Sequence, residues 1–263
     1  MNFTKQDDSM KSFTEQLRKR LTPYYLNLQE LVKECGNETI KQADFMCVQW
    51  GRNFPDEKYK GLMFYGRATN GIEDDAYRGE AMLGDNPYSL FNRMDQMEWI
   101  ASKGSPFVNL MRLITHVYYQ GEPWYHNIAW SNVCKINEKE ENARNPNPSE
   151  ECWELQLKDV SDIIKVELEE ISPKVAIFVT GVVAGDDWHA PLLRAFEEGK
   201  DLEVIVKEKP WPGYEDEKYP PSITAYKRGE QLIIITERPE FREYETPMKL
   251  ITELIDKYAI SLE

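Results

Sequence analysis

The chain has 263 residues, of which 32 are Lys or Arg and 46 are Asp or Glu, so its formal net charge is −14. Nucleic-acid-binding proteins usually show a basic footprint, so this acidity weakens a simple case for such binding, although a local basic face stays compatible with it. A hydrophobic content of 41% with 12% aromatic residues argues against disorder. No apolar run reaches the roughly 20 residues that a membrane-spanning helix needs, so we expect no membrane partner.

The N-terminal stretch and the cysteines bear on the cellular compartment. The stretch MNFTKQDDSMKSF lacks the apolar core of a secretory signal. Cys35, Cys47, Cys134 and Cys152 form no CxxC pair, which fits neither a disulfide framework nor a zinc site and is typical of reduced intracellular thiols. We expect a cytoplasmic monomer with no metal and no cofactor.

The first half of the chain alternates predicted helices with one predicted strand. Residues 1–36 predict a helical segment packed on the core, interrupted at Pro23. The short apolar run at 62–65 between two glycines predicts a buried strand. Residues 89–100 predict a helix, and Ser105-Pro106 opens another with apolar residues on one face.

The second half continues this alternation. Residues 127–131 predict a strand, and Asn147-Pro148-Ser149-Glu150 predicts the start of a long helix capped by Asn147. Pro173 should end that helix, and the uninterrupted apolar run 174–180 predicts a strand buried on both faces. The remaining elements are a short helix at 191–196, a half-exposed strand at 202–206, a hairpin over 223–235 and a helix starting at Thr246-Pro247.

This order of elements predicts an α/β protein, a single domain over 1–263 with its core at 62–242. We expect a three-layer α/β/α sandwich in which a mostly parallel central sheet carries helices on both faces. In such sheets ligands bind beyond the carboxyl ends of the strands. We therefore expect 66–70, Asn132 and Arg238, which follow three of the predicted strands, to line one cleft.

The residues at these strand ends allow both functional and structural interpretations. The loop after the first strand has two glycines that can bring backbone N–H groups near an anion, but it matches neither a P-loop nor GxGxxG and is equally a polar turn. The amide of Asn132 can pair with a donor and an acceptor on a base edge, or it can form a turn. Arg238 lies in a charged loop ended by Pro239.

Taken together, the strand ends resemble motifs of the uracil-DNA glycosylase superfamily over about residues 62–242. The closest pattern is that of its iron–sulfur branch, whose first loop reads G-E-A-P-G and then E-D, where this chain has GRATNG at 66–71 and then Glu73-Asp74. The second motif of the branch, T-N-V-V-K, corresponds to SNVCK at 131–135. The N-R-x-P-x-P-E-E stretch that follows it corresponds to NARNPNPSEE at 142–151. The P-K-V-x-x-x-x-x-G pattern of the third strand is matched at 173–181. The last motif, T-x-H-P, corresponds to TERP at 236–239.

The resemblance implies a hydrolase that flips a damaged or deaminated base out of DNA and cleaves its N-glycosidic bond. It implies that Asn132 reads the edge of the base and that Tyr65 or Phe107 stacks on its ring. Gly66 and Arg67 would line the base-binding site. DNA, as a duplex or a single strand, is the partner implied.

The chain departs from the family at both catalytic motifs. Arg67 stands where the branch has its first-loop Glu, and Arg cannot act as a base. Asn70, or else Asp74, would then hold the attacking water, as an amide does in the mismatch-specific branch. Arg238 replaces the last-motif His, where its charge could stabilise the departing base, bind a phosphate or lie at the surface.

The remaining basic residues bear on contacts with a nucleic-acid backbone, and the cysteines bear on an iron–sulfur cluster. The side chains expected to contact a nucleic-acid backbone are Lys135, Arg144 and Arg242. The cluster cysteines of the branch do not carry over, because the position that should pair with Cys152 is Ile136, so no iron–sulfur cluster is predicted.

Two other functions stay open at this point. The chain could be a relative that binds nucleic acid or nucleotide without catalysis, or a hydrolase of free nucleosides. The net charge of −14 favours both over a DNA glycosylase, and whether the protein is an enzyme is left undecided by the sequence.

Overall fold

The computed structural model describes residues 3–54, 61–68, 94–121, 123–138, 148–181, 190–196, 200–240 and 242–259. Its helices are α1 (Phe3–Glu34), α2 (Met94–Ala101), α3 (Pro106–Tyr118), α4 (Glu150–Ile171), α5 (Ala190–Ala195) and α6 (Glu245–Tyr258), with 3₁₀ turns at Ile40–Gln42 and Trp124–Asn127. Its strands are β1 (Asp44–Phe45), β2 (Gln49–Trp50), β3 (Leu62–Gly66), β4 (Ile128–Asn132), β5 (Ile136–Asn137), β6 (Val175–Val179), β7 (Glu203–Pro210), β8 (Ser222–Arg228) and β9 (Gln231–Thr236).

The central sheet has the strand order β2-β4-β3-β6-β9-β8-β7. Strands β4, β3, β6 and β9 run parallel, while β2, β8 and β7 pair antiparallel at the two sides. The predicted strands at 62–65, 127–131 and 174–180 therefore share one sheet with the second strand of the predicted hairpin, and Phe178 in β6 is fully buried. The protein is an α/β protein with a mixed, largely parallel central sheet.

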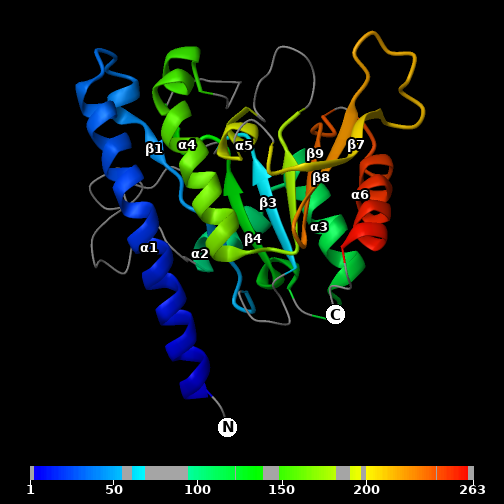
Figure 1. Ribbon diagram of the computed structural model, residues 1–263, viewed down its shortest axis with the longest axis horizontal. Coiled ribbons are helices and arrows are strands. Elements are labelled where there is room, and N and C mark those ends of the chain that lie inside the picture. The colour runs from blue at the N-terminus through cyan, green and yellow to red at the C-terminus, as the bar shows by residue number, and fades with distance from the viewer. Residues whose placement is uncertain are drawn as a thin grey trace.

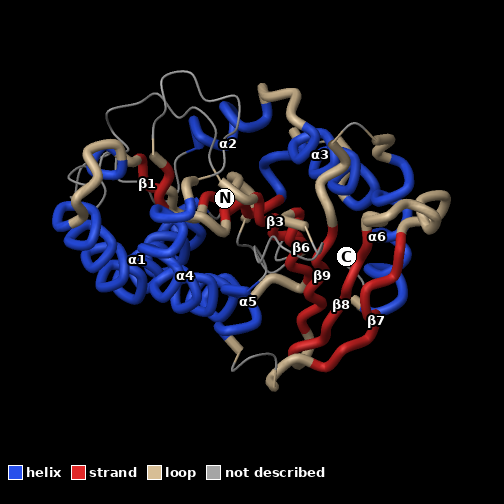
Figure 2. Tube along the Cα trace, turned by 90° about the horizontal axis from the view of Figure 1, so that it is seen from above, coloured by secondary structure: helices blue, strands red, loops and turns tan. Residues whose placement is uncertain are grey.

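Helices cover both faces of this sheet (Figures 1 and 2). α4 and α5 lie against one face, and α1 packs along α4 on the outside, its N-terminal part extending beyond the rest of the described fold (Figure 1). α2, α3 and α6 lie on the opposite side (Figure 2). Parallel strands need this double cover because both of their faces are apolar: every residue of β3, β4 and β6 is buried.

The order of the parallel strands creates a switch point at β3. The chain passes from β3 to β4 on one side and later returns to β6 on the other side of β3. Connections that leave in opposite directions open a crevice at the carboxyl ends of the strands, where open α/β sheets bind ligands.

The expected interruption at Pro23 is wrong, because α1 continues through it as one helix. Pro23 is exposed, as is Lys19, whose carbonyl loses its helical N–H donor to the proline. Water can satisfy a carbonyl on that side of a helix. The opposite face of α1 is held by buried apolar residues on both sides of the proline, including Leu21 and Tyr25, so packing outweighs the local defect.

The predicted cap of α4 is also displaced. Ser149, not Asn147, is the N-cap: its hydroxyl accepts from the backbone N–H of Cys152 at 3.2 Å. The two acidic residues that follow, Glu150 and Glu151, lie in the first turn, where the helix dipole favours negative charge. The helix ends at Ile171 before Pro173, as predicted, with Ser172 in the left-handed region.

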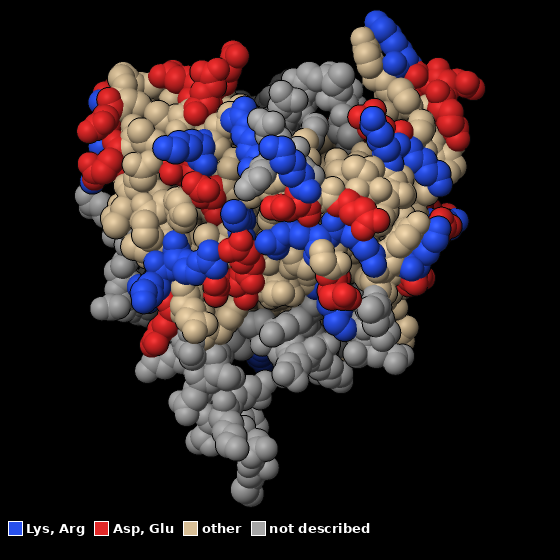
Figure 3. Space-filling view, in the orientation of Figure 1, with Lys and Arg blue, Asp and Glu red and all other residues tan. Residues whose placement is uncertain are grey.

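Charge is mixed over the surface. On the face drawn in Figure 3, basic and acidic side chains are interspersed, without a broad field of one sign. Within the described part of the chain, no helix combines the length and apolar character required to cross a membrane.

Replacing Pro23 by Ala should stabilise the protein. The substitution restores the missing backbone donor and removes the ring from an exposed position in the middle of α1, so the free energy of unfolding should rise by about 1–3 kcal/mol. Urea unfolding followed by far-UV circular dichroism measures the change.

Leu26→Ala is the matched control, because Leu26 lies on the same helix with 47% of its surface exposed. It should change the unfolding free energy by no more than about 0.5 kcal/mol. A destabilised Pro23→Ala protein would contradict the account of α1 given above.

Candidate functional site

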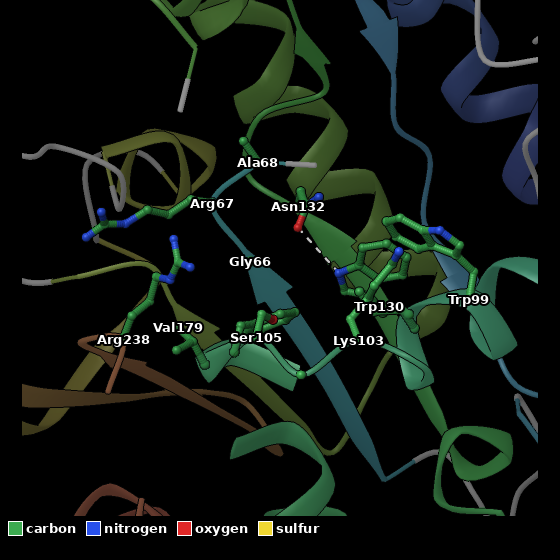
Figure 4. Close-up of a pocket in the computed structure, with 13 residues that line it drawn as sticks. Gly66, Arg67, Ala68, Trp99, Lys103, Ser105, Trp130, Asn132, Val179 and Arg238 are labelled. Carbon is green, nitrogen blue, oxygen red and sulfur yellow. Dashed lines mark hydrogen bonds between the residues drawn. The ribbon is translucent and has the colours of Figure 1, made fainter. Parts of the chain in front are cut away.

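A pocket of about 390 Å³ lies at the carboxyl ends of the parallel strands. Its lining comes from the ends of β3, β4, β6 and β9 together with the end of α2, the start of α3 and the residues between these helices (Figure 4). The lining residues are Gly66, Arg67, Ala68, Trp99, Ile100, Lys103, Gly104, Ser105, Phe107, Trp130, Asn132, Val179 and Arg238. This is the switch point of the sheet, and the volume falls in the range of about 300–1,000 Å³ that is common for small-molecule sites.

Gly66 allows an amide and an aromatic ring to approach the end of β3 together. A Cβ at this position would lie 2.5 Å from Oδ1 of Asn132 and 3.4 Å from Cε1 of Phe107. The first distance is shorter than any side chain tolerates, so only glycine permits this arrangement. Parallel pairing of Gly66 with Asn132 sets it up, because each is the last residue of its strand.

The amide of Asn132 is oriented by a neighbouring indole. Nε1 of Trp130 donates to Oδ1 of Asn132 at 3.3 Å (Figure 4). Because an indole N–H only donates, this bond distinguishes the oxygen of the amide from its nitrogen. Asn132 is only 1% exposed, so a buried and oriented amide forms part of the pocket wall.

Tyr65, one of the two predicted stacking rings, does not reach the pocket. Successive side chains of a strand point to opposite faces, so Tyr65 points away from the face on which Gly66 meets Phe107. Its ring stacks on Phe178 with centroids 4.2 Å apart and an interplanar angle of 2°. Burial raises the pKa of Tyr65 well above its usual value, and the nearby carboxylate of Glu167 raises it further. Phe107, which is 7% exposed and lines the pocket, is the ring that remains for stacking.

Lys135, which we expected to contact a nucleic-acid backbone, is fully buried instead. Its Nζ donates to both carboxylate oxygens of Glu167, at 2.8 and 3.0 Å, and to Oγ of Ser131 at 2.7 Å. Both side chains of the Lys135–Glu167 ion pair are 0% exposed. A lysine held in this way cannot reach a phosphate outside the protein, so that prediction is wrong.

A second set of bonds ties the loop after β4 to α4. Oε1 of Gln156 accepts from the backbone N–H groups of Lys135 and Ile136, at 2.7 and 3.0 Å. Its Nε2 donates to the carbonyl of Ile136 at 2.9 Å. The same loop stays paired with the chain after β3, since Val133 and Cys134 donate to the carbonyls of Gly66 and Arg67. The backbone behind Asn132 is thus held from two sides.

Two guanidinium groups lie at the other end of the pocket from Trp99 and Trp130 (Figure 4). Nε of Arg67 donates to the carbonyl of Thr180 at 2.6 Å, and its Nη2 lies 4.0 Å from Oε2 of Glu237. Nη2 of Arg238 pairs with Oε1 of Glu240 at 2.9 Å. Burial lowers the pKa of Arg238; the carboxylate of Glu240 raises it and the charge of Arg67 lowers it.

Gly181 makes room for the Arg67 side of this arrangement. Its φ of +102° is in the region that favours glycine. A Cβ there would lie 2.7 Å from Nη2 of Arg67 and 2.9 Å from Oε2 of Glu237. The glycine that ends the predicted strand 174–180 thus has a role in the site as well as in the turn.

The structure brings together Gly66, Arg67, Phe107, Asn132 and Arg238 of the predicted site residues. Arg242 is not among the lining residues; its Nη2 pairs with Oε2 of Glu217 at 3.0 Å and its guanidinium lies 5.6 Å from the ring of Tyr214. Asn70, Asp74 and Arg144 lie outside the described residues, so their roles stay predictions.

Sequence reasoning missed the aromatic wall of the pocket. The sequence could have predicted that Trp130 lines the pocket, because residues two apart on a strand share a face and Asn132 was already a candidate site residue. Trp99 and Lys103 gave no such signal: they follow from the placement of the α2–α3 segment, where Nζ of Lys103 lies 4.3 Å from the centroid of the Trp99 ring.

Within the described ranges no cluster of three or more His, Cys, Asp or Glu side chains is arranged to hold a metal ion, and all four cysteines are free thiols. Comparisons of the sequence with models of protein families and with curated proteins find no match. The resemblance to the uracil-DNA glycosylase superfamily therefore depends on the motifs and on the positions of their residues.

Removing one partner of the buried ion pair should destabilise the protein strongly. Lys135→Met or Glu167→Gln leaves an uncompensated group in the core, which typically costs about 3–5 kcal/mol. The double variant Lys135→Met/Glu167→Leu removes both charges and should recover most of that loss. Chemical denaturation of the three variants measures it.

The control is the exposed pair Lys41–Glu38, whose side chains are 36% and 80% exposed. Lys41→Met should cost less than about 1 kcal/mol. Equal losses in the Lys135 and Lys41 variants would mean that burial does not strengthen the dependence on the partner charge.

Proposed function

We propose that this pocket binds a nucleobase and that the protein is a hydrolase of the uracil-DNA glycosylase type, acting on a damaged or deaminated base in DNA. The observation that supports this best is the convergence on Gly66 of the Asn132 amide and the Phe107 ring. An amide recognises the polar edge of a base and a ring packs on its face. Asn132 lies in one of the motifs, and Phe107 was one of the two rings expected to stack on the base.

The composition of the pocket fits such a ligand. Aromatic rings from three segments, Trp99, Phe107 and Trp130, surround one oriented amide. Sites for flat heterocycles combine apolar walls with a few placed polar groups. A flipped base is recognised through stacking and through hydrogen bonds to its Watson–Crick edge.

Hydrolysis of the glycosidic bond would need two further groups. Attack at the sugar carbon requires a positioned water, a task that the resemblance gives to Asn70 or Asp74 in the loop after β3. Negative charge on the departing base requires stabilisation of the oxyanion-hole type. Arg238 is the pocket residue at the last-motif position, and a guanidinium stays charged over the physiological pH range.

A free nucleoside is the second candidate substrate, and the charge distribution favours it. Two of the three basic side chains that line the pocket lie near carboxylates: Arg67 lies near Glu237, and Arg238 pairs with Glu240. Lys135 is buried as well, so it, Arg67 and Arg238 leave little uncompensated charge at the pocket to attract a duplex.

Asn132→Ala should abolish base recognition. In a single-turnover assay with excess protein, the rate of base release should fall by about 10²–10³, the usual effect of removing one essential polar contact in a catalytic site. The substrates are oligonucleotides that contain uracil, hypoxanthine or a thymine mismatch, with alkali cleavage to reveal abasic sites. Free deoxyuridine and deoxyinosine are assayed in parallel by chromatography of the released base.

Asn27→Ala provides the control, since Asn27 is an exposed residue of α1 that does not line the pocket; its amide donates to Asp159 of α4. Its rate should equal that of the wild type. Release of base from free nucleosides alone would favour the second candidate. If the wild type releases no base from any substrate, the hydrolase proposal is wrong, and a non-catalytic binding protein becomes the better interpretation.

A further inference from the structure

The pocket has two chemically different ends. Around Gly66 lie the amide and the rings described above, whereas Arg67 and Arg238 occupy the opposite end (Figure 4). A neutral base accounts for the first end only. Two guanidinium groups that share one end of a pocket repel each other. Glu237 and Glu240 lie near them, and an anion between the two groups would offset the repulsion further.

Arg67 is held in place by the protein. The bond from its Nε to the carbonyl of Thr180, at 2.6 Å, fixes the plane of the guanidinium. Its Nη2 lies 4.0 Å from Oε2 of Glu237, within ion-pair distance. The side chains of Arg67 and Glu237 are 13% and 11% exposed, so this charge lies mostly out of water at the edge of the pocket.

Arg238 carries a buried donor that the protein does not use. Its side chain is 17% exposed, and among the described residues its Nε has no hydrogen-bond partner. Glu240, which is 42% exposed, engages Nη2 from the solvent side. A buried N–H without an acceptor is costly, and a ligand oxygen in the pocket would satisfy it.

We infer that Arg67 and Arg238 form a phosphate subsite, so that the pocket takes a base together with a phosphate group. Guanidinium forks match phosphate oxygens in geometry and charge. The base end of this ligand rests on the proposed function; the phosphate end rests only on the two arginines. The phosphate belongs either to a free 5′-nucleotide or to the backbone of a strand that carries the bound base.

Isothermal titration of the wild type with inorganic phosphate, deoxyuridine, dUMP and a uracil-containing single-stranded pentanucleotide tests this inference. dUMP should bind at least about tenfold more tightly than deoxyuridine, the effect expected of a hydrogen bond to a charged group. Arg238→Gln should abolish this ratio by weakening the binding of dUMP, and Arg238→Lys should restore part of it. Binding of inorganic phosphate should weaken in Arg67→Gln and in Arg238→Gln alike.

Arg112→Gln is the matched control, since Arg112 is exposed on α3 and bonds to Asn109; it should leave every affinity unchanged. Thermal unfolding of each variant establishes that it folds. If Arg238→Gln weakens dUMP but not the pentanucleotide, the phosphate comes from a free nucleotide; if it weakens both, a strand phosphate uses the same subsite.

The inference is wrong if the wild type binds neither phosphate nor dUMP, or binds dUMP no better than deoxyuridine. Failure of the proposed function gives a different result. Phosphate binding that depends on Arg67 and Arg238, in a protein that neither binds deoxyuridine nor releases any base, would retain the subsite and discard the nucleobase hydrolase.

Discussion

The buried ion pair between Lys135 and Glu167 is the constraint on which the site depends. Removing two charges from water is costly, and mutual attraction compensates only when the geometry is close and the remaining donors are satisfied. Here both carboxylate oxygens bind the ammonium, and Ser131 takes part as well. α4 and the end of β4 must therefore keep one relative position. Asn132, the neighbour of Ser131 on the opposite face of the strand, is positioned by the same contacts.

This arrangement separates support from recognition across the sheet. Tyr65, Ser131, Lys135 and Glu167 make a charged and aromatic layer on the side of α4, closed to solvent. On the other face, Gly66 and Asn132 open onto the pocket. Period-two alternation along β3 and β4 produces both layers from adjacent residues. An oriented amide held by a rigid layer is suited to recognition, because little side-chain freedom is lost when a ligand binds.

The electrostatics of the pocket differ from those of a nucleic-acid groove. Both arginines that line the pocket lie near carboxylates, Arg67 near Glu237 and Arg238 beside Glu240. Such pairs cancel at a distance, so they provide little long-range steering of a polyanion. Under both proposals, selectivity comes from contacts inside the pocket, where Arg67 and Arg238 are mostly removed from water.

Local patterns were sufficient for much of the fold. The apolar run at 174–180 and the Ser-Pro start of α3 predicted elements that the structure contains, because burial on both faces and capping leave signals within a few residues. Elements of two residues, such as β1 and β2, gave none. The predicted interruption at Pro23 was wrong because the proline destabilises the helix only locally, whereas the packing that keeps α1 continuous comes from residues distant in sequence.

The site residues also fall into two groups, those that the sequence could predict and those that only the structure could place. Motif order along the chain identified Gly66, Asn132 and Arg238, since parallel strands bring their carboxyl ends together whatever lies between them. Phe107, in α3, was only one of two rings that the resemblance offered for stacking. The sequence could not show that Lys135 is buried or that Tyr65 faces away from the pocket. Those outcomes depend on Glu167, Phe178 and the register of neighbouring strands. Burial and partner charge are properties of the assembled fold, so only the tertiary structure distinguishes an internal ion pair from a phosphate contact.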